Sequence, residues 1–137
     1  MTEAMAGPCV TNKLLSAGIR TTRQRIALAE LLFAGGDKHV TAEELHAFAE
    51  KANQRVSLAT VYNTLKHFSE AGLVREVATP GQTSYFDTNV SDHHHYFVES
   101  ENTLVDITDA SVTIHGLPEA PLGKRVGRVD IIVHLVD

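Results

Sequence analysis

The most regular alternation of apolar and polar positions in the chain lies between Val56 and Phe68. Apolar side chains recur there at every third or fourth position, which predicts an amphipathic helix with one buried face. These positions are Leu58, Val61, Leu65 and Phe68. Ser57 is a favourable N-cap, and Gly72 can end the helix in a left-handed conformation.

The opposite face of this predicted helix is small and polar. It carries Ala59, Thr60, Asn63, Lys66 and His67, with Tyr62 and Thr64 on its flanks. No bulky aliphatic group keeps this face away from base edges or phosphates, so one interpretation is a helix that lies in a groove of DNA. The other interpretation is an ordinary surface helix.

Further helix signals precede this stretch. Helices are predicted at residues 13–17 and 22–33, and each is followed by glycine. The spacing of Thr41 and Glu44 is that of a capping box, which predicts the start of a third helix. A short turn over residues 53–56 joins that helix to the one with the polar face. The pair predicts a helix-turn-helix unit.

A hairpin is predicted directly after the helix-turn-helix. Residues 73–77 and 83–87 alternate between apolar and polar side chains, as strands do, and Pro80-Gly81 lies between them. Such a hairpin is the wing of a winged helix-turn-helix. That scaffold is typical of DNA-binding proteins, although it also serves protein contacts.

The rest of the chain predicts a small sheet. Short strands are indicated at residues 96–98, 103–107, 111–114 and 129–136. Two prolines make residues 117–123 a loop. The last strand is the most hydrophobic, and pairing with a second subunit would cover it.

We therefore predict an α+β fold with two domains. A winged helix-turn-helix DNA-binding domain covers residues 1–87, and residues 88–92 form a hinge. Residues 93–137 form a small α/β dimerisation and sensing domain dominated by strands. In this hypothesis, ligand binding between the domains sets the angle of the reading heads on DNA.

Charge separates the same two parts. The 137 residues carry a net charge of −5, which is unusual for a DNA-binding protein. Residues 1–86 hold nine Lys or Arg against eight Asp or Glu, a net of +1. Residues 87–137 hold three against nine, a net of −6, and five of the eight histidines. The asymmetry indicates two modules with different partners.

Some classes are disfavoured by composition. We find no apolar run of the roughly 20 residues that a membrane-spanning helix needs, and no secretory signal at the start of the sequence. Cys9 is the single cysteine, so no intrachain disulfide and no multi-cysteine zinc site can form. These features predict a cytoplasmic protein without membrane contact.

The most unusual motif is the run His93-His94-His95, which begins a predicted strand. Alternation along a strand sends His93 and His95 to one face and His94 to the other. Three such imidazoles cannot easily meet at one ion. They suit two neighbouring metal sites, or axial ligation of haem, and a solvated turn is the remaining interpretation.

Four motifs in order resemble the ferric uptake regulator family. They are Thr22-Arg-Gln-Arg25, His39-Val-Thr-Ala-Glu-Glu-Leu45, Leu58-Ala-Thr-Val-Tyr62 and His93-His-His95. The Val-Tyr-Asn form of the helix and the triple histidine before an aromatic residue are most similar to the iron response regulator subgroup of alphaproteobacteria. The resemblance implies a homodimeric transcription factor, often a repressor, that binds a promoter palindrome of double-stranded DNA and responds to iron.

The resemblance also implies roles for DNA-contacting residues. Tyr62 would contact thymine methyl groups, and the polar groups of Ser57, Thr60 and Asn63 would face bases or phosphates. Arg23 and Arg25 would contact phosphate or the minor groove. Many relatives have arginine where Asn63 stands, so a different base preference is expected.

Metal ligands are implied in the same way. An inter-domain sensory site would use a histidine of the third helix, an acid at the end of the wing and a histidine of the cluster, while a second site would use further histidines. The matching positions are His39, Asp87 and His94 for the first site, and His93, His95 and His134 for the second. Tyr96 replaces a further expected histidine. Oxygen and imidazole donors suit Fe(II), Mn(II) or Zn(II).

Two features of the family are missing. The paired cysteines that hold a structural zinc after the histidine cluster are absent, so we expect no such zinc. Haem-responsive members carry Cys-Pro near the N-terminus, whereas this chain has Pro8-Cys9. We expect Cys9 to be an inert thiol, while haem ligation by His93, His94 and His95 stays open.

Two other classes of function compete with a regulator. One is a metal or haem store that uses the winged domain for protein contacts. The other is a hydrolase in which histidine-bound metal activates water. No recognisable motif places a nucleophile or acid near the cluster, which disfavours the hydrolase.

Overall fold

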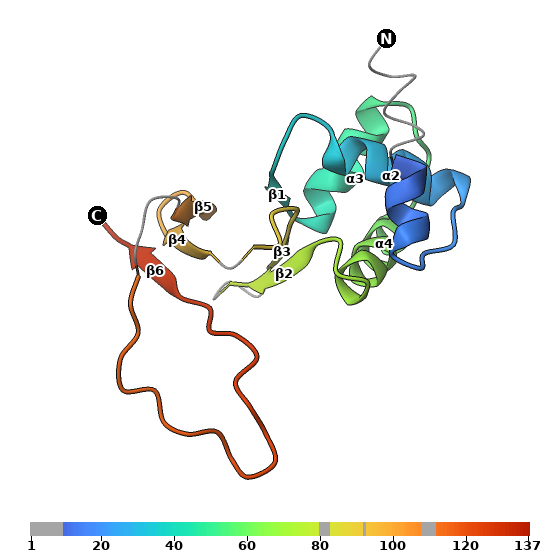
Figure 1. Cartoon of the computed structure of the whole chain (residues 1–137). Helices are drawn as coiled ribbons and strands as arrows, with labels where there is room; N and C mark the ends of the chain where they lie inside the picture. The colour runs from blue at the N-terminus through green and yellow to red at the C-terminus, as the bar shows by residue number, and fades with distance from the viewer. Residues whose placement is uncertain (1–9, 80–82, 92, 108–111) are drawn as a thin grey trace. The chain divides into compact units, whose positions relative to one another are not determined.

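The computed structural model describes residues 10–79, 83–91, 93–107 and 112–137. The chain divides into two compact units, Met1–Val90 and Ser91–Asp137. Figure 1 shows helices and a three-stranded sheet in the first unit and strands in the second. Each unit is described separately below. Cys9 and the Pro80-Gly81 turn lie outside the described residues.

Among its described residues, the first unit contains four helical segments. Residues 10–16 are helical and are followed by α2 (Arg23–Phe33), α3 (Ala42–Lys51) and α4 (Leu58–Glu70). Their apolar faces pack into one core, in which the largest fully buried side chains include Leu14, Leu28, Leu32, Leu45, Leu65 and Phe68. The predicted helix-turn-helix is confirmed as α3 and α4.

The helix ends follow the capping signals in the sequence. Thr41 Oγ1 accepts a hydrogen bond from the Glu44 amide at 3.0 Å, and Glu44 Oε1 accepts one from the Thr41 amide at 2.9 Å. Ser57 Oγ accepts from the Thr60 amide at 3.0 Å at the start of α4. Gly72 has a φ of 81° directly after α4, a conformation that glycine adopts without strain. The predicted capping box and the left-handed stop are both confirmed.

The buried face of α4 differs in two positions from the prediction. Leu58 is 41% exposed, whereas Thr64 is buried together with Val61, Leu65 and Phe68. Successive residues are about 100° apart around a helix, so Leu58 lies at the margin of the sector that these four residues define. The prediction that Leu58 is buried was therefore wrong.

The sheet of the first unit contains one strand that was not predicted. β2 (Arg75–Ala78) and β3 (Ser84–Asp87) form the antiparallel wing, and β1 (His39–Val40) pairs with β3 on its other side. His39 was expected in the third helix, which is wrong. The helix begins only after the Thr41 cap, and the two residues before the cap remain extended and pair with β3.

The second unit is a three-stranded sheet with the order β5-β4-β6. β4 (His94–Val98) pairs antiparallel with β5 (Thr103–Ile107) and parallel with β6 (Ile132–Leu135). Residues 112–131 contain no helix or strand, so the predicted loop at 117–123 is confirmed. The predicted strand at 111–114 is wrong for residues 112–114, because no strand among the described residues pairs with them. Ser111 lies outside the described residues.

An ion pair links α4 to the wing. Lys66 Nζ donates a hydrogen bond to Glu76 Oε1 at 2.9 Å. That bond holds the pKa of the Glu76 carboxyl below its ordinary value of 4.5 and raises the pKa of the Lys66 ammonium above 10.5.

In the part of the chain that the structure describes, no helix is long and apolar enough to cross a membrane.

Replacing Thr41 with alanine should lower the free energy of unfolding of the first unit by about 1 kcal/mol, because the Glu44 amide loses its acceptor. Urea denaturation of full-length protein measures the change. Thr41→Ser keeps the hydroxyl and should remain close to the parent. Equal losses in the two variants would contradict a capping role.

The Lys66–Glu76 pair should stabilise the fold over a defined pH range. Its contribution is present above the unfolded pKa of Glu76 and is lost as pH falls through the lowered folded value. It is also present below the unfolded pKa of Lys66 and is lost as pH rises through the raised folded value. The stability difference between parent and Glu76→Gln should thus be constant at neutral pH and shrink below 4.5 and above 10.5. Thermal unfolding followed across pH measures this difference. Glu30→Gln, an exposed substitution on α2, is the control.

Candidate functional site

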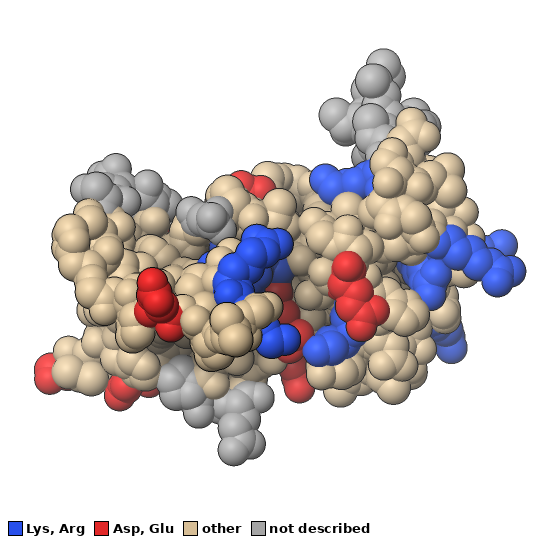
Figure 2. Space-filling model, turned by 60° about the horizontal axis from the view of Figure 1, so that its bottom comes forward, with Lys and Arg blue, Asp and Glu red and all other residues tan. Residues whose placement is uncertain are grey.

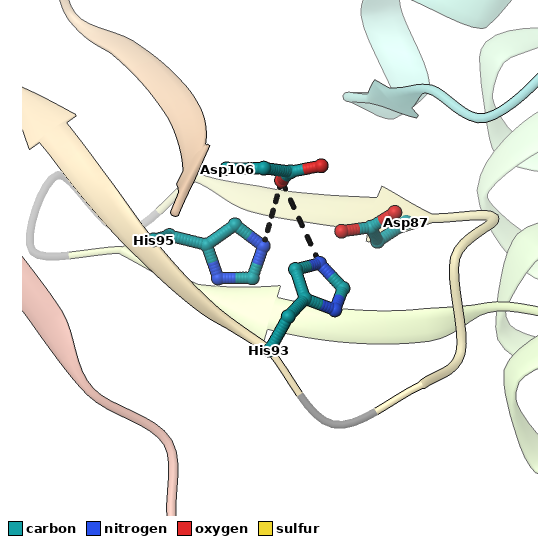
Figure 3. A group of neighbouring side chains, drawn as sticks. All are labelled: Asp87, His93, His95 and Asp106. Carbon is teal, nitrogen blue, oxygen red and sulfur yellow. Dashed lines mark ion pairs between the residues drawn. The ribbon is translucent and has the colours of Figure 1, made fainter. Parts of the chain in front are cut away.

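Two imidazoles and a carboxylate meet in the second unit. His93 Nε2 lies 3.5 Å and His95 Nε2 3.3 Å from the same atom, Asp106 Oδ1. The two imidazole ring centroids are 4.6 Å apart. Figure 3 shows both rings directed at the carboxylate, with dashed lines for the two ion pairs. In this group of His93, His95 and Asp106, the side chain of His95 is only 2% exposed, whereas those of His93 and Asp106 are 10% and 26% exposed, so the group is partly open to water.

Local sequence explains the arrangement. Alternation places His93 and His95 on the same face of the chain leading into and along β4, as predicted. The β4–β5 hairpin sets His95 directly opposite Asp106. Side chains of directly opposite residues in an antiparallel pair are in contact range. The hairpin therefore brings His95 and Asp106 together, and His93 joins them from the segment directly before β4.

The hydrogen bond on the far side of the His93 ring decides which nitrogen is available. His93 Nδ1 is 2.7 Å from the Ser91 carbonyl oxygen. A carbonyl only accepts, so Nδ1 carries a proton. The imidazolium, with Nε2 also protonated, pairs with Asp106, and the neutral ring offers its Nε2 lone pair to a metal ion. A histidine that ligates a metal is commonly fixed in this way, with its other nitrogen bonded to a carbonyl.

The donor set and its spacing suit a divalent metal ion. Ligand atoms of His93, His95 and Asp106 all lie within 4.8 Å of one another. Metal bonds of about 2.1 Å in tetrahedral geometry separate the donors by roughly 3.4 Å, close to the distances observed here. Two imidazoles and one carboxylate fit Fe(II), Mn(II) or Zn(II).

Asp106 was not among the predicted ligands. The signal for it was present, because the turn at residues 100–102 joins two predicted strands. Counting the pairs outward from that turn puts Asp106 across from His95. The prediction considered each strand by itself, and a ligand set that crosses two strands cannot be found in that way.

His94 and His134 are placed apart from this group. His94 Nδ1 accepts a hydrogen bond from the Ile131 amide at 3.1 Å, on the opposite face of β4. In the neutral ring Nε2 then carries the proton, so ligation through Nε2 would require His94 to give up this bond. His134 Nδ1 lies 2.8 Å from Glu99 Oε2, and its ring meets Phe97 edge-on.

The two predicted ligands of the first unit are neighbours within that unit. His39 and Asp87 are directly opposite each other in the β1–β3 pair. The Asp87 side chain is fully buried and accepts a hydrogen bond from the Asn89 amide at 2.9 Å. Figure 3 also labels Asp87, which belongs to the first unit and is described with it. Their role as ligands stays a prediction.

The outer face of α4 has the predicted polar character. Ala59, Tyr62, Asn63 and His67 are exposed, and Thr60 and Lys66 are partly buried. Tyr62 is 43% exposed, with its ring edge-on to Phe86 at a centroid distance of 6.4 Å. The Tyr62 ring therefore packs against Phe86 and is still exposed enough to contact an external surface.

The remaining residues predicted to contact DNA lie at the start of α4 and at the start of α2. Ser57 Oγ is engaged in capping and also donates to Thr60 Oγ1 at 2.9 Å, so both hydroxyls are held in place. Arg23 is exposed at the first position of α2, and Arg25 follows in the same first turn and is partly buried. On the face drawn in Figure 2, Lys and Arg side chains gather at the right of the view with no acidic side chain among them.

Comparison with known proteins gives a consistent family assignment. Residues 16–117 match the ferric uptake regulator family. The peroxide operon regulator of Bacillus subtilis (strain 168) is 39% identical over 93 residues, 68% of this chain and 63% of that protein. The peroxide-responsive repressor PerR of Staphylococcus aureus (strain Mu50) is 36% identical over 93 residues, 68% of this chain and 62% of that protein. The match thus spans less than two thirds of the length of these relatives.

A solved structure extends the likeness in fold. The ferric uptake regulator of Pseudomonas aeruginosa with manganese superposes with a TM-score of 0.72, covering 93% of this chain and 97% of that one, at 21% identity. At this identity the likeness concerns the fold. Since the family match covers well over half of the sequence, the chain belongs to the ferric uptake regulator family.

Proposed function

We propose that this chain is a metal-responsive transcriptional regulator that binds double-stranded DNA through its first unit and a divalent metal ion through its second. The observation that carries the proposal is the group of His93, His95 and Asp106 in a chain whose other unit is a winged helix-turn-helix. Fe(II) or Mn(II) is the proposed ion, and Zn(II) fits the same donors.

Contacts to DNA would come from α4 and the start of α2. The exposed polar face of α4 supports base contacts by Tyr62 and Asn63, together with the hydroxyls of Ser57 and Thr60. Arg23 and Arg25 are placed for phosphate contacts, which hold a protein in register on the duplex without reading the bases.

The proposed assembly is a homodimer on a palindromic operator. Apolar side chains on β5 and β6 support it, because Val105, Val133 and Leu135 are each more than a third exposed. Covering them with a second copy would bury apolar surface and give the two-fold symmetry of an inverted repeat. The hinge at residues 88–92, which would couple ligand binding to the reading heads, belongs to this proposal.

The physiological signal is proposed to be iron status, with haem as one form of it. The triple histidine motif, similar to the iron response regulator subgroup, favours this signal and keeps His93, His94 and His95 as haem ligands. A second candidate is a peroxide response. It is favoured by the 34–39% identity to proteins named as peroxide regulators.

A regulator is preferred to an enzyme or a metal store, and a cytoplasmic location goes with it. The winged unit makes up most of the chain, and the polar face of α4 would have no role in a hydrolase and would serve only protein contacts in a store. Catalysis by metal-bound water also needs a positioned acid or base, and no recognisable sequence motif places one near the histidine cluster.

Metal affinity should depend on the residues that meet at Asp106. His95→Ala and Asp106→Asn should weaken Mn(II) binding by more than the roughly 10- to 100-fold that follows loss of a ligand's hydrogen-bond partner. Isothermal titration of the full-length protein measures this, and circular dichroism reports whether each variant is folded. DNA binding to an inverted repeat should lose its dependence on Mn(II) in the same variants.

His94→Ala is the matched control, because it removes an imidazole from the opposite face of the same strand. It should retain Mn(II) binding. Loss of binding in His94→Ala with retention in His95→Ala would contradict the ligand set of His93, His95 and Asp106. It would favour the first of the two sets that the family resemblance implies, His39, Asp87 and His94.

Haem and peroxide challenges should separate the two signals. For an iron-status regulator, haem should lower the affinity of the metal-loaded protein for DNA and shift the haem absorption band, and replacing His93, His94 and His95 with alanine should abolish the shift. Peroxide should leave DNA binding unchanged. A response to peroxide without a response to haem would favour the second candidate.

A further inference from the structure

A basic depression lies beside the polar face of α4, within the first unit. It has a volume of about 320 Å³ and lies between the start of α2 and the polar side of α4. Its lining residues on α2 and the preceding segment are Arg20, Thr22, Gln24 and Arg25, and those on α4 are Thr60, Asn63, Thr64 and His67. Since one wall carries Asn63 and Thr60, the depression adjoins the surface proposed to face the bases.

The guanidinium of Arg25 is held in place at two points. Nη1 donates to the Arg20 carbonyl at 2.9 Å, and Nη2 donates to His67 Nδ1 at 3.1 Å. Guanidinium offers five N–H donors, so these two bonds fix its plane while others remain for a ligand. A long side chain that is already ordered loses less entropy when it binds a partner.

The contact with Arg25 also determines the tautomer of the neutral His67 ring. Because Nδ1 accepts from Arg25, the neutral ring carries its proton on Nε2, which makes Nε2 a donor. The imidazole thus acts as an acceptor for the arginine on one side and offers a donor on the other.

Charge selects the kind of ligand. Two guanidinium groups, of Arg20 and Arg25, line the depression, and none of its lining residues is acidic. The first turn of α2 also lacks an acidic residue, whereas the first turn of α3 contains Glu43 and Glu44. Arginine forks match the geometry of phosphate oxygens, so a phosphate is the anion that fits.

We propose that Arg25 binds one phosphate of the DNA backbone beside the bases that α4 faces, and that His67 is the positioning residue that orients its guanidinium. The inference rests on the proposed DNA-binding function, which already includes a phosphate contact by Arg25. It adds the place of that contact beside α4 and the role of His67, which acts through Arg25. Arg25 provides affinity for any sequence, and Asn63 beside it remains free to select bases.

The test is DNA binding by metal-loaded, full-length protein, measured by fluorescence anisotropy on an inverted-repeat duplex across a series of potassium chloride concentrations. Arg25→Ala should reduce the slope of log affinity against log salt by about 0.9 for each phosphate that the protein no longer neutralises. Affinities for specific and unrelated duplexes should fall by a similar factor. Lys124→Ala, which removes one exposed positive charge from the second unit, is the control and should change neither quantity appreciably.

His67 has its own signature in the same assay. His67→Ala should weaken binding less than Arg25→Ala and keep the salt slope, because the charge remains but its orientation is no longer fixed. His67→Asn, whose amide oxygen can replace Nδ1 as acceptor, should recover most of the affinity. The Arg25→Ala/His67→Ala double variant should be no weaker than Arg25→Ala alone, since the two residues act as one unit.

The outcomes separate this inference from the proposed function. A parent protein that binds no inverted repeat with any metal would overturn both. A parent that binds, with Arg25→Ala matching Lys124→Ala in affinity and slope, would overturn the phosphate contact alone. Saturable binding of inorganic phosphate that needs Arg25, without an effect of Arg25→Ala on DNA, would identify a site for the free anion and overturn the DNA contact. Additive losses of affinity in the double variant would overturn the positioning role of His67.

Discussion

Burial of one face of α4 determines the arrangement of the first unit, because the same helix must satisfy the core on one side and present polar groups on the other. Val61, Leu65 and Phe68 have no exposed surface, and each large apolar side chain buried in this way contributes about 1.5–3 kcal/mol. Rotating α4 by even a small angle would expose these groups. The core thereby fixes the direction of Tyr62, Asn63 and His67, and the depression that holds Arg25 is a result of that orientation.

Features set by neighbouring residues in the sequence were predictable. Helical periodicity and capping chemistry located α3 and α4, since the bonds of Thr41 and Ser57 are made within three residues. Alternation correctly separated His93 and His95 from His94. The candidate metal site could be predicted only in part, because its carboxylate comes from another strand. Asp106 belongs to the site through cross-strand register, which depends on pairing rather than on local pattern.

The remaining differences have the same physical origin. β1 is two residues long and has no propensity signal of its own, so it exists only because β3 offers it hydrogen-bonding partners. Leu58 fits the apolar spacing of α4 but lies at the margin of the buried sector, where spacing alone does not distinguish core from surface. Residues 112–114 have suitable β-branched side chains, but no described strand lies next to them in a sheet. In each case the outcome depended on a partner distant in the sequence.

The way β6 joins its sheet bears on the order in which the second unit folds. The β4–β5 hairpin closes through a turn of a few residues, whereas β6 pairs with β4 only after the long connection that follows Ile107. Loop-closure entropy makes such distant parallel pairing slow compared with a hairpin. His95 and Asp106 belong to this hairpin and His93 directly precedes it, so the three can come together before the last strand attaches. An ion captured at that stage would clamp the hairpin and help to nucleate the sheet on which β6 later docks.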